Sequence, residues 1–478
     1  MSLQPPKATQ SKLCETYGDK IKIKGVKMSI AETEIEKLEN GDCNENNVFF
    51  QALEEVVRSI APLLESDPKY KKYAVLERLI VPDRIIKFKV TWFDDHQNVM
   101  VNTGYRVQFN NSLGPYKGGL RFHPSVNEGI LKFLGFEQIL KNALTGLPIG
   151  GAKGGSDFDP KGKSDFEVMK FCSAFMKELY KYIGPRIDIP AGDIGVGGRE
   201  IGFLFGEYKK ITSKYEGVLT GKPFMFGGSL MRPEATGYGA VYFTQKMLEI
   251  ENKEPLEGKI CTVSGAGNVA LHAIEKLLQI GAIPVTCSDS QGTIYHASGV
   301  DITLLKVLKL EKRASLEEYI KTYPHAEYIP TTNYPEDGHA VWNIPCYAAF
   351  PCATQNELTI VDAKNLIANG CVSVTEGANM PSTPEAIELF LSQKICFAPA
   401  KAANAGGVAV SEFEMSQNAA MQKWSFEKVD KKLKETMEHI CKRVALTAKD
   451  YGVEGNYVDG ANIAGFKKVA DAMIAEGI

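Results

Sequence analysis

The sequence predicts an α/β protein with two domains and a cleft between them. Three observations lead to this fold class. The chain has 478 residues, which is more than a single hydrophobic core usually contains. Both helical and strand-like patterns occur before about residue 220, where the sequence becomes rich in Gly and Pro and poor in charge. Residues 259–292 then have the pattern of a strand, a glycine turn, a helix and a strand, which is the βαβ unit of a parallel sheet.

The shift in composition sets the expected domain limits. Residues 1–30 are a polar N-terminal extension, residues 31–227 form the first domain, and residues 228–451 form the second. The last segment, residues 452–478, is expected to pack back on the first domain. The Gly- and Pro-containing stretch near residue 220 is the expected crossing between the two domains.

The composition is ordinary for a globular protein and argues against several classes of partner. With a net charge of −3, nothing favours binding to nucleic acid or to a membrane surface. No apolar run approaches the roughly 20 residues of a membrane span, and the N-terminus lacks the apolar region of a secretory signal. The ten cysteines form no CxxC pair and the seven histidines form no HExxH motif, so we expect reduced thiols and no metal. These features favour the cytoplasm, or an organelle matrix if a leader has been removed.

The first domain is predicted to contain helices at its start, then strands, then more helices. Residues 30–80 have helical apolar periodicity, and residues 84–109 have the pattern of strands separated by turn residues. Ser125 and Glu128 have the S-x-x-E spacing of a capping box, which predicts a helix start ahead of ILKFLGFEQILKNAL. That helix should end near Gly146.

Three further segments have clear patterns. Residues 165–183 predict another amphipathic helix. Residues 300–340 are charged and loop-rich, with one helical stretch, and short apolar runs after them fit later strands of the second sheet. Residues 412–450 predict one long helix.

The glycine turn of the βαβ unit has the spacing of a dinucleotide-binding motif. The sequence SGAGNVA fits G-x-G-x-x-A, in which Gly265 makes the tight turn and Gly267 lets the backbone approach a pyrophosphate. Ala270 would pack the helix against the strand, and Asn268 and Val269 open the helix, whose N-terminus faces phosphate. A plain structural βα turn is the alternative, but the flanking strands favour a Rossmann-like, nucleotide-binding domain.

The residues after the second strand bear on the choice between NAD and NADP. NAD-binding proteins usually place an acid there to bind the ribose 2′-hydroxyl. Here Ser288 and Ser290 leave room for a 2′-phosphate and can donate to it, whereas Asp289 would repel it. Lys306 is a candidate to assist, although a helical lysine is usually only solvated. We predict NADP, with NAD as the alternative.

Three lysines lie in glycine-rich or helix-end settings within a short stretch. Lys117 belongs to GPYKGGLRF, Lys141 to LKNALTG and Lys153 to GGAKGGSD. Glycines let a backbone come close to a ligand, and lysines supply point charges and an amine with a tunable pKa. Asp193 follows in the glycine loop PAGDIGVGG and can transfer protons. Together these residues predict a site for a small dianion beside a nicotinamide.

Such a site suits hydride removal from a carbon that bears an amine. The reaction leaves an iminium that water must attack, so it needs a neutral amine, a proton-transferring carboxylate and cationic anchors for the substrate's carboxylates. If Lys117 and Lys141 converge on Lys153, their charges lower its pKa. We therefore predict Lys153 and Asp193 as the catalytic pair.

Each residue taken alone has an ordinary explanation. Lys141 lies four residues after Glu137, which is the spacing of a helix-surface ion pair. Lys117 fits a turn, Asp193 fits a carboxylate that satisfies turn backbone, and Lys153 is in a glycine run that breaks the phosphate-loop pattern. Only their joint presence favours the catalytic interpretation.

At this point the motifs amount to a family resemblance. GPYKGGLRF, KNALTGLPIGGAKGG, PAGDIGVGG, FGGSLMRPEATGYG, SGAGNVA, PCATQNEL, EGANMP and KAANAGGVAVSEFEMSQN occur in this order, followed by VDGANIAGF. Over nearly the whole chain from about residue 45, it closely resembles the hexameric, NADP-type glutamate dehydrogenases. The resemblance implies a homohexamer whose first domain binds substrate and mediates oligomerisation. It also implies L-glutamate, 2-oxoglutarate and ammonium as substrates, and NADP as cofactor.

The resemblance also assigns roles to single residues. Lys117 and Ser411 resemble the groups that grip the substrate's side-chain carboxylate. Lys141 resembles the α-carboxylate lysine, with Gln138 and Asn404 beside it, and Val408 would line the pocket along the substrate's methylenes. Lys153 resembles the lysine that activates water and polarises the carbonyl, and Asp193 resembles the proton-transfer carboxylate. The residues implied to line the cofactor cleft are Arg232, Thr236, Asn268 and Asn379, and in this family SDS at residues 288–290 accompanies NADP.

Two positions depart from the family pattern, and two other functions compete. Tyr347 stands where the family commonly has Asp, and would alter packing under the loop on the nicotinamide side. Ala400 replaces a usual glycine and would stiffen the loop that leads to Asn404.

A dehydrogenase for another amino acid is disfavoured by Lys117 and Ser411, because an apolar side chain leaves a buried lysine unpaired. A catalytically silent nucleotide-binding regulatory protein is disfavoured because both catalytic candidates are present.

Overall fold

The computed structural model describes residues 47–477, which belong to one compact unit. The N-terminal extension that we predicted over residues 1–30 lies outside the described residues. In the described part of the chain, no helix is both long enough and apolar enough to cross a membrane.

The N-terminal half is built on a mixed five-stranded sheet with the strand order β1-β2-β4-β3-β5. The first two strands form an antiparallel hairpin, which confirms the strands predicted over residues 84–109. Strand β3 lies between β4 and β5 and is parallel to both, so the C-terminal ends of these three strands point to the same side of the sheet. The strands are β1 (Arg84–Phe93), β2 (Val99–Asn110), β3 (Tyr116–Phe122), β4 (Gly151–Ser156) and β5 (Asp188–Gly192).

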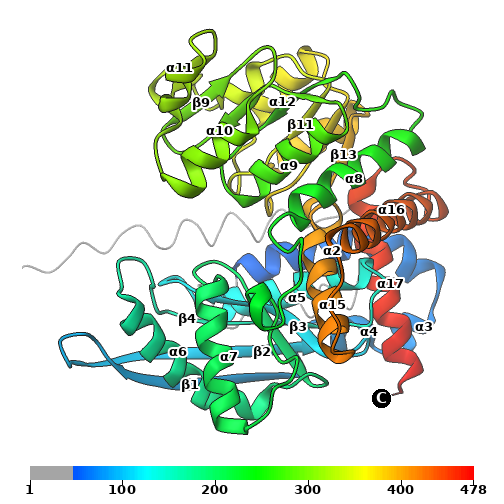
Figure 1. Ribbon diagram of the computed structural model, residues 1–478. Helices are drawn as coiled ribbons and strands as arrows, with labels where there is room; N and C mark the ends of the chain where they lie inside the picture. Colours follow the sequence, from blue (N-terminus) through cyan, green and yellow to red (C-terminus); the bar gives the residue numbers. More distant parts are fainter. Residues whose placement is uncertain (1–46, 478) are drawn as a thin grey trace, which may run out of the picture. The chain divides into compact units, whose positions relative to one another are not determined.

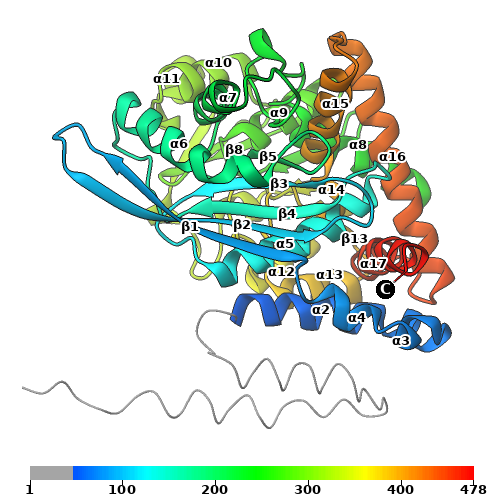
Figure 2. The ribbon, with the colours of Figure 1, turned by 90° about the horizontal axis from the view of Figure 1, so that it is seen from below.

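Helices cover both faces of this sheet, as Figure 2 shows. On one face, α6 (Asp165–Leu179) and α7 (Gly198–Thr212) pack together over the sheet, with α6 against β1. On the other face, α5 (Glu128–Leu144) packs against β2 and β4 and is itself covered by α2 (Asn47–Ser66). The short helices α3 (Lys69–Lys72) and α4 (Val75–Leu79) follow α2.

The start of α5 differs from the prediction, whereas α6 begins with a capping box. The Asn127 side chain, not that of Ser125, accepts the capping hydrogen bond, from Ile130 N. The Ser125 hydroxyl bonds the His123 ring at 2.8 Å instead, and Glu128 pairs with Lys132, so the predicted Ser125–Glu128 box is wrong. In α6, Ser164 and Glu167 satisfy each other's backbone N–H groups. That helix ends at Leu179, and one 3-10 turn (Tyr180–Tyr182) completes the stretch predicted to 183.

The second half is built on a five-stranded parallel sheet with the order β13-β12-β11-β6-β7. Strand β6, helix α9 and strand β7 confirm the predicted βαβ unit. The sheet strands are β6 (Ile260–Val263), β7 (Ile283–Pro284), β11 (Ala348–Phe350), β12 (Ser373–Thr375) and β13 (Cys396–Ala398). The helices around it are α8 (Ala235–Ile250), α9 (Asn268–Gln279), α10 (Ile302–Lys306), α12 (Ile360–Ala368) and α13 (Pro384–Ser392).

The predicted second strand of the βαβ unit is divided between two sheets. Its first residues form β7, and its last residues form β8 (Thr286–Ser288), which pairs antiparallel with β9 (Gly292–Tyr295). Strand β10 (Glu327–Pro330) completes this small sheet. Between β9 and β10, α10 continues into a π-helical turn, η3 (Val307–Glu311), and the short helix α11 (Tyr319–Thr322) follows.

The long helix predicted over residues 412–450 is two helices. Helix α15 (Gly406–Ala419) ends before Met421, which has a positive φ of 53°, and α16 (Phe426–Asp450) starts after the N-cap Ser425. The polar segment between them closes one helix and caps the next, which apolar periodicity alone does not reveal. Helix α14 (Ala400–Ala403) precedes α15. The final helix, α17 (Tyr457–Ala475), packs against α5 and α2 of the N-terminal half and also against α16.

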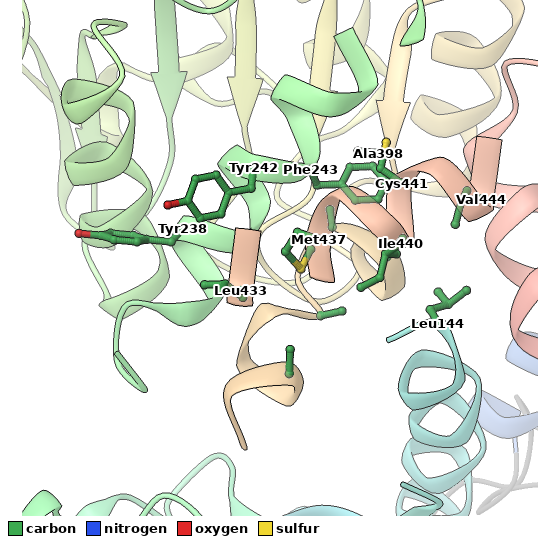
Figure 3. Packing of buried hydrophobic residues seen from close by; sticks show 14 of the residues in the cluster. Leu144, Tyr238, Tyr242, Phe243, Ala398, Leu433, Met437, Ile440, Cys441 and Val444 are labelled. Carbon is green, nitrogen blue, oxygen red and sulfur yellow. The ribbon is translucent and has the colours of Figure 1, made fainter. Parts of the chain in front are cut away.

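A hydrophobic cluster contains residues of both halves of the chain (Figure 3), and the helices α5, α8 and α16 that contribute to it are labelled in Figure 1. Phe243 of α8 and Met437 and Ile440 of α16 lie in its centre, and Leu144 at the end of α5 belongs to the same cluster. All four side chains are almost fully buried. Leu144 thus brings the end of α5 into a core shared with α8 and α16 of the second half.

Candidate active site

A cavity of about 360 Å³ brings together residues from both halves of the chain. The N-terminal half contributes the first half of β3, the middle of β4, the end of β5 and one face of α5. The second half contributes the start of α8 and α9, the loops after β11 and β12, and helix α15. Twelve of the predicted site residues line it: Lys117, Gln138, Lys141, Lys153, Asp193, Arg232, Thr236, Val269, Asn379, Asn404, Val408 and Ser411.

Glycines at the edge of the sheet make room for the charged groups. Gly119 follows Lys117 on β3, and a Cβ there would lie 2.8 Å from Asp193 Cβ and 3.3 Å from Lys153 Nζ. A side chain at this position would displace both groups. Gly119 is therefore explained by the space that Lys153 and Asp193 need, whereas a Cβ at Gly118 would lie 1.6 Å from the Ala152 carbonyl oxygen of the neighbouring strand β4.

Lys153 on β4 and Asp193 at the end of β5 face each other across β3, which lies between these two strands. Lys153 Nζ lies 3.3 Å from Asp193 Oδ1, and Arg121 Nε on β3 donates to Asp193 Oδ2 at 2.7 Å. Burial lowers the pKa of the Lys153 amine, although Asp193 opposes this effect. Burial alone would raise the pKa of Asp193, but the charges of Lys153 and Arg121 outweigh it and keep that pKa below its usual range. The pair thus contains an amine and a carboxylate whose pKa values are both lowered.

Lys117 ends in a hydroxyl-lined corner of the cavity. Its Nζ donates to Thr220 Oγ1 at 2.8 Å, and Thr220 Oγ1 lies 2.5 Å from Ser411 Oγ. Lys117 is only 2% exposed, and burial, with the nearby Arg106 and Arg232 cations, lowers its pKa well below the usual range. Thr220 is a site residue that the sequence did not reveal, because it lies outside the glycine motifs in the segment between the two domains.

Lys141 is held from the second half of the chain. Its Nζ donates to Asn404 Oδ1, and Asn404 Nδ2 donates to Asn379 Oδ1 at 2.9 Å and to the Ala378 carbonyl at 3.1 Å. Burial and the neighbouring Lys153 cation lower the pKa of Lys141 to about 8. Asn404 therefore orients Lys141, while Gln138 one turn earlier on α5 lines the cavity beside it.

The alternative of a Lys141–Glu137 surface pair does not hold among the described residues. Glu137 instead lies 3.5 Å from Lys401 of α14, which also lies 3.8 Å from Glu55 of α2. Burial would lower the pKa of Lys401, but the two carboxylates outweigh it and raise that pKa. This buried charge cluster ties α14, which precedes Asn404, to the helix that carries Lys141.

Arg232 lies nearer the lysines than its predicted place in a cofactor cleft suggests. It lowers the pKa of both Lys117 and Lys141 through its charge, and a Cβ at Gly407 would lie 3.5 Å from its Nη1. Its buried Nε has no hydrogen-bond partner in the described part of the chain. A guanidinium whose buried Nε has no partner, beside two lysines, fits an anion in the cavity.

The glycine turn after β6 has the geometry that a pyrophosphate needs. Gly265 has a φ of +87°, and a Cβ there would lie 2.9 Å from the Cys352 carbonyl oxygen. Gly267 is the N-cap of α9, and no side chain caps this helix. A Cβ at Gly267 would meet nothing within 4 Å, so the first N–H groups of α9 remain open to a phosphate. Asn268 donates to the Pro233 carbonyl at 2.5 Å, and Val269 reaches the cavity.

The three residues after the second strand point in different directions. Ser288 is 1% exposed, and its Oγ accepts a hydrogen bond from Gly265 N at 2.9 Å. It therefore supports the glycine turn from beneath, and its burial argues against the predicted hydrogen bond to a 2′-phosphate. Ser290 is exposed, and the Asp289 carboxylate is bound by protein groups. Lys306, the candidate helper, pairs with Glu275 at 2.5 Å instead.

The two departures from the family pattern lie away from the reacting groups. Tyr347 precedes β11, at the end of the strand opposite to the cavity-lining Cys352, and its hydroxyl donates to the Glu254 carbonyl at 2.8 Å. Tyr347 therefore contacts the segment that precedes β6, at the end of β11 away from the cavity. Ala400 is the first residue of α14, where alanine suits the helix, and its N–H donates to Glu376 Oε2 at 2.8 Å.

Comparisons with known proteins match both halves of the chain. A family model described as Glutamate/Leucine/Phenylalanine/Valine dehydrogenase matches residues 227–477. The model for the Glu/Leu/Phe/Val dehydrogenase dimerisation domain matches residues 82–210.

Individual relatives extend over nearly the full chain. The NADP-specific glutamate dehydrogenase of Helicobacter pylori is 61% identical over 430 residues, which cover 90% of this chain and 96% of that protein. The NADP-specific glutamate dehydrogenase of Escherichia coli is 53% identical over 436 residues, covering 90% of this chain and 95% of that protein. The crystal structure of Plasmodium falciparum glutamate dehydrogenase superposes with a TM-score of 0.89 at 51% identity, covering 94% of each chain. With the two-domain fold and the lysine-lined cavity, these matches show that the chain belongs to the glutamate/leucine/phenylalanine/valine dehydrogenase family.

Proposed function

We propose that this protein is an NADP-dependent glutamate dehydrogenase. It would interconvert L-glutamate, NADP and water with 2-oxoglutarate, ammonium and NADPH. The observation that carries the proposal is the cavity itself, where three lysines and Asp193 converge and the amine of Lys117 is buried without a carboxylate partner in the described chain. The names of the relatives agree with this substrate and cofactor.

The two ends of the cavity suit the two carboxylates of the substrate. At one end, Lys117, Thr220 and Ser411 would bind the side-chain carboxylate. At the other, Lys141, oriented by Asn404, would bind the α-carboxylate, with Gln138 beside it. Cationic anchors at both ends favour a dianion, because burying a carboxylate requires a paired charge.

The wall between these anchors supports two more assignments. Val408 on α15 would contact the methylenes of the substrate. We reassign Arg232 from the cofactor to the substrate, because its guanidinium lies close to the two anchoring lysines. Thr236, Asn379 and Val269 remain assigned to the nicotinamide side of the cavity.

The catalytic proposal rests on the Lys153–Asp193 pair. NADP, held by Gly265, Gly267 and the start of α9, would accept the hydride from the substrate's α-carbon. Lys153, whose pKa is lowered by burial, would in its neutral form take a proton from the water that attacks the α-carbon, and in its protonated form would polarise the developing carbonyl. Asp193, kept ionised by Lys153 and Arg121, would exchange protons with the amino group. Their mutual distance of 3.3 Å allows a proton to pass between them.

Two alternatives fit the site less well. An enzyme for leucine, phenylalanine or valine would leave the buried Lys117 amine without an anion. A silent nucleotide-binding protein would have no need of the complete Lys153–Asp193 pair. We further propose a cytoplasmic homohexamer, which the family resemblance implies.

Initial rates of NADP reduction with L-glutamate, L-leucine, L-phenylalanine and L-valine would test the proposal. We expect turnover with L-glutamate alone among the four, and faster turnover with NADP than with NAD. Faster turnover of any apolar amino acid would overturn the substrate assignment. Equal rates with NAD and NADP would overturn the cofactor assignment and leave the reaction unchanged.

A further inference from the structure

We propose that Lys309 is the positioning residue that gives this protein its preference for NADP, because it binds Asp289 and withholds that carboxylate from the cofactor. This inference rests on the proposed NADP-dependent reaction. It addresses a feature that the site leaves unexplained: an acidic residue stands at the place where NAD-binding proteins usually hold the ribose 2′-hydroxyl.

Both oxygens of the Asp289 carboxylate are engaged by protein groups. Oδ2 accepts a hydrogen bond from Lys309 Nζ at 2.7 Å. Oδ1 accepts from the backbone N–H groups of Gln291 at 2.9 Å and Gly292 at 3.3 Å. The carboxylate thus closes the turn between β8 and β9 and is oriented toward that turn.

Lys309 is placed for this contact by an unusual backbone segment. It lies in the π-helical turn η3, which widens the end of α10 and is closed by the hydrogen bond from Lys312 N to the Val307 carbonyl at 2.9 Å. The neighbouring Leu308 is buried in the domain core and anchors the turn. Lys309 Nζ also donates to the Ala314 carbonyl at 3.0 Å, so the amine is fixed from two sides.

The pair changes the charge that a cofactor meets at the end of β8. A free Asp289 would repel a 2′-phosphate and could accept a hydrogen bond from a 2′-hydroxyl, which favours NAD. Paired with Lys309, the same position is close to neutral. The side chains are only partly exposed, Lys309 at 19% and Asp289 at 15%, so solvent screens their charges incompletely. Ser290, which is exposed next to this pair, remains free to donate to the phosphate.

The chain offers a matched control in Lys306. This lysine lies three residues earlier, at the end of α10, and pairs with Glu275 at 2.5 Å, not with Asp289. Removing either lysine deletes one partly buried ion pair from the same region. Only the removal of Lys309 frees the carboxylate at the end of β8.

The test compares the binding of NADPH and NADH, followed by the fluorescence of the reduced nicotinamide, in the full-length protein. Lys309→Met should weaken NADPH binding by about tenfold to about a hundredfold and leave NADH binding unchanged or tighter. The unpaired Asp289 carboxylate would repel the 2′-phosphate, which NADH lacks. Lys306→Met should keep the wild-type ratio of the two dissociation constants. In the double variant Lys309→Met/Asp289→Asn, NADPH binding should recover, because the repelling charge is gone.

Several results would overturn the proposal. One is a Lys309→Met protein whose NADPH-to-NADH ratio stays within about twofold of the wild-type ratio. Another is an equal loss of both nucleotides that Lys309→Arg does not restore, which would indicate a structural role only. Wild-type protein that binds both nucleotides equally would also exclude it. Selective NADPH binding without glutamate turnover would instead refute the proposed function and leave the role of Lys309 standing.

Discussion

Replacing Lys117 by leucine tests the substrate assignment through a single buried charge. The Lys117 amine is 2% exposed and donates to Thr220, and no carboxylate lies within ion-pair distance of it in the described chain. Leucine would keep an apolar stem in the same space and remove the charge. The change therefore alters the pairing of the substrate's side-chain carboxylate and little else.

The magnitude follows from the burial of that carboxylate. Removing one partner of a buried ion pair costs about 3–5 kcal/mol, because the remaining charge is left without compensation. Since about 1.4 kcal/mol corresponds to a factor of ten, kcat/KM for L-glutamate should fall by about 10²–10⁴-fold. For norvaline, which has an apolar side chain, kcat/KM should instead rise in Lys117→Leu, because the wild-type cavity leaves the Lys117 amine unpaired against this substrate.

Steady-state rates with both amino acids would measure this change. Lys132→Leu serves as the control, since Lys132 is on α5 but pairs with Glu128 at 3.2 Å on the partly exposed face of that helix. That variant should keep kcat/KM within about twofold. If Lys117→Leu retains kcat/KM for glutamate within about threefold of wild type, the side-chain carboxylate does not bind at Lys117 and the reasoning fails.

Two other lysines at the cavity give predictions of their own. Because the pKa of Lys141 is lowered to about 8, the free enzyme loses this charge as the pH rises through that value, and the inhibition constant of glutarate, a dicarboxylate without an amine, should then rise. A flat profile between about pH 7 and about pH 9 would exclude Lys141 as an anchor. Lys401→Met would leave the partly buried Glu137 without its ion-pair partner, so the free energy of unfolding should fall by about 1–3 kcal/mol. The same variant should raise KM for 2-oxoglutarate more than it lowers kcat, because Lys401 ties α14, before Asn404, to the helix that carries Lys141. An unchanged KM in a destabilised variant would mean that Lys401 contributes to stability and not to substrate binding.

The sequence was sufficient to predict the parts of the site that lie in glycine-rich motifs. Gly119 leaves space for Lys153 and Asp193, and Gly118 and Gly155 let neighbouring strands approach closely, so these requirements are written into the local sequence. The same holds for Gly265 and Gly267, whose conformation and open space are needed wherever a phosphate approaches a helix.

Other residues could not be predicted because their roles depend on long-range packing. Thr220 lies in the segment between the domains and meets Lys117 only because strand β3 and that segment fold together. Lys309 contacts Asp289 through a π-helical turn that has no sequence pattern of its own. Ser288 was assigned to the cofactor by its position after the strand, but its side chain is on the buried side of the turn. The N-cap of α5 was misplaced for a similar reason, since the pattern permits a cap at either of two nearby polar residues and the backbone selects one.

The most direct test of the proposed chemistry compares wild-type protein with Lys153→Met. The oxidation of NADPH would be followed in the presence of 2-oxoglutarate and ammonium, and the binding of both ligands would be measured in each protein. We expect turnover by the wild-type protein and a loss of about 10²–10⁴-fold in kcat for the variant, with both ligands still bound. Absence of turnover in the wild-type protein, or undiminished turnover in Lys153→Met, would contradict the assignment of this cavity as the glutamate dehydrogenase active site.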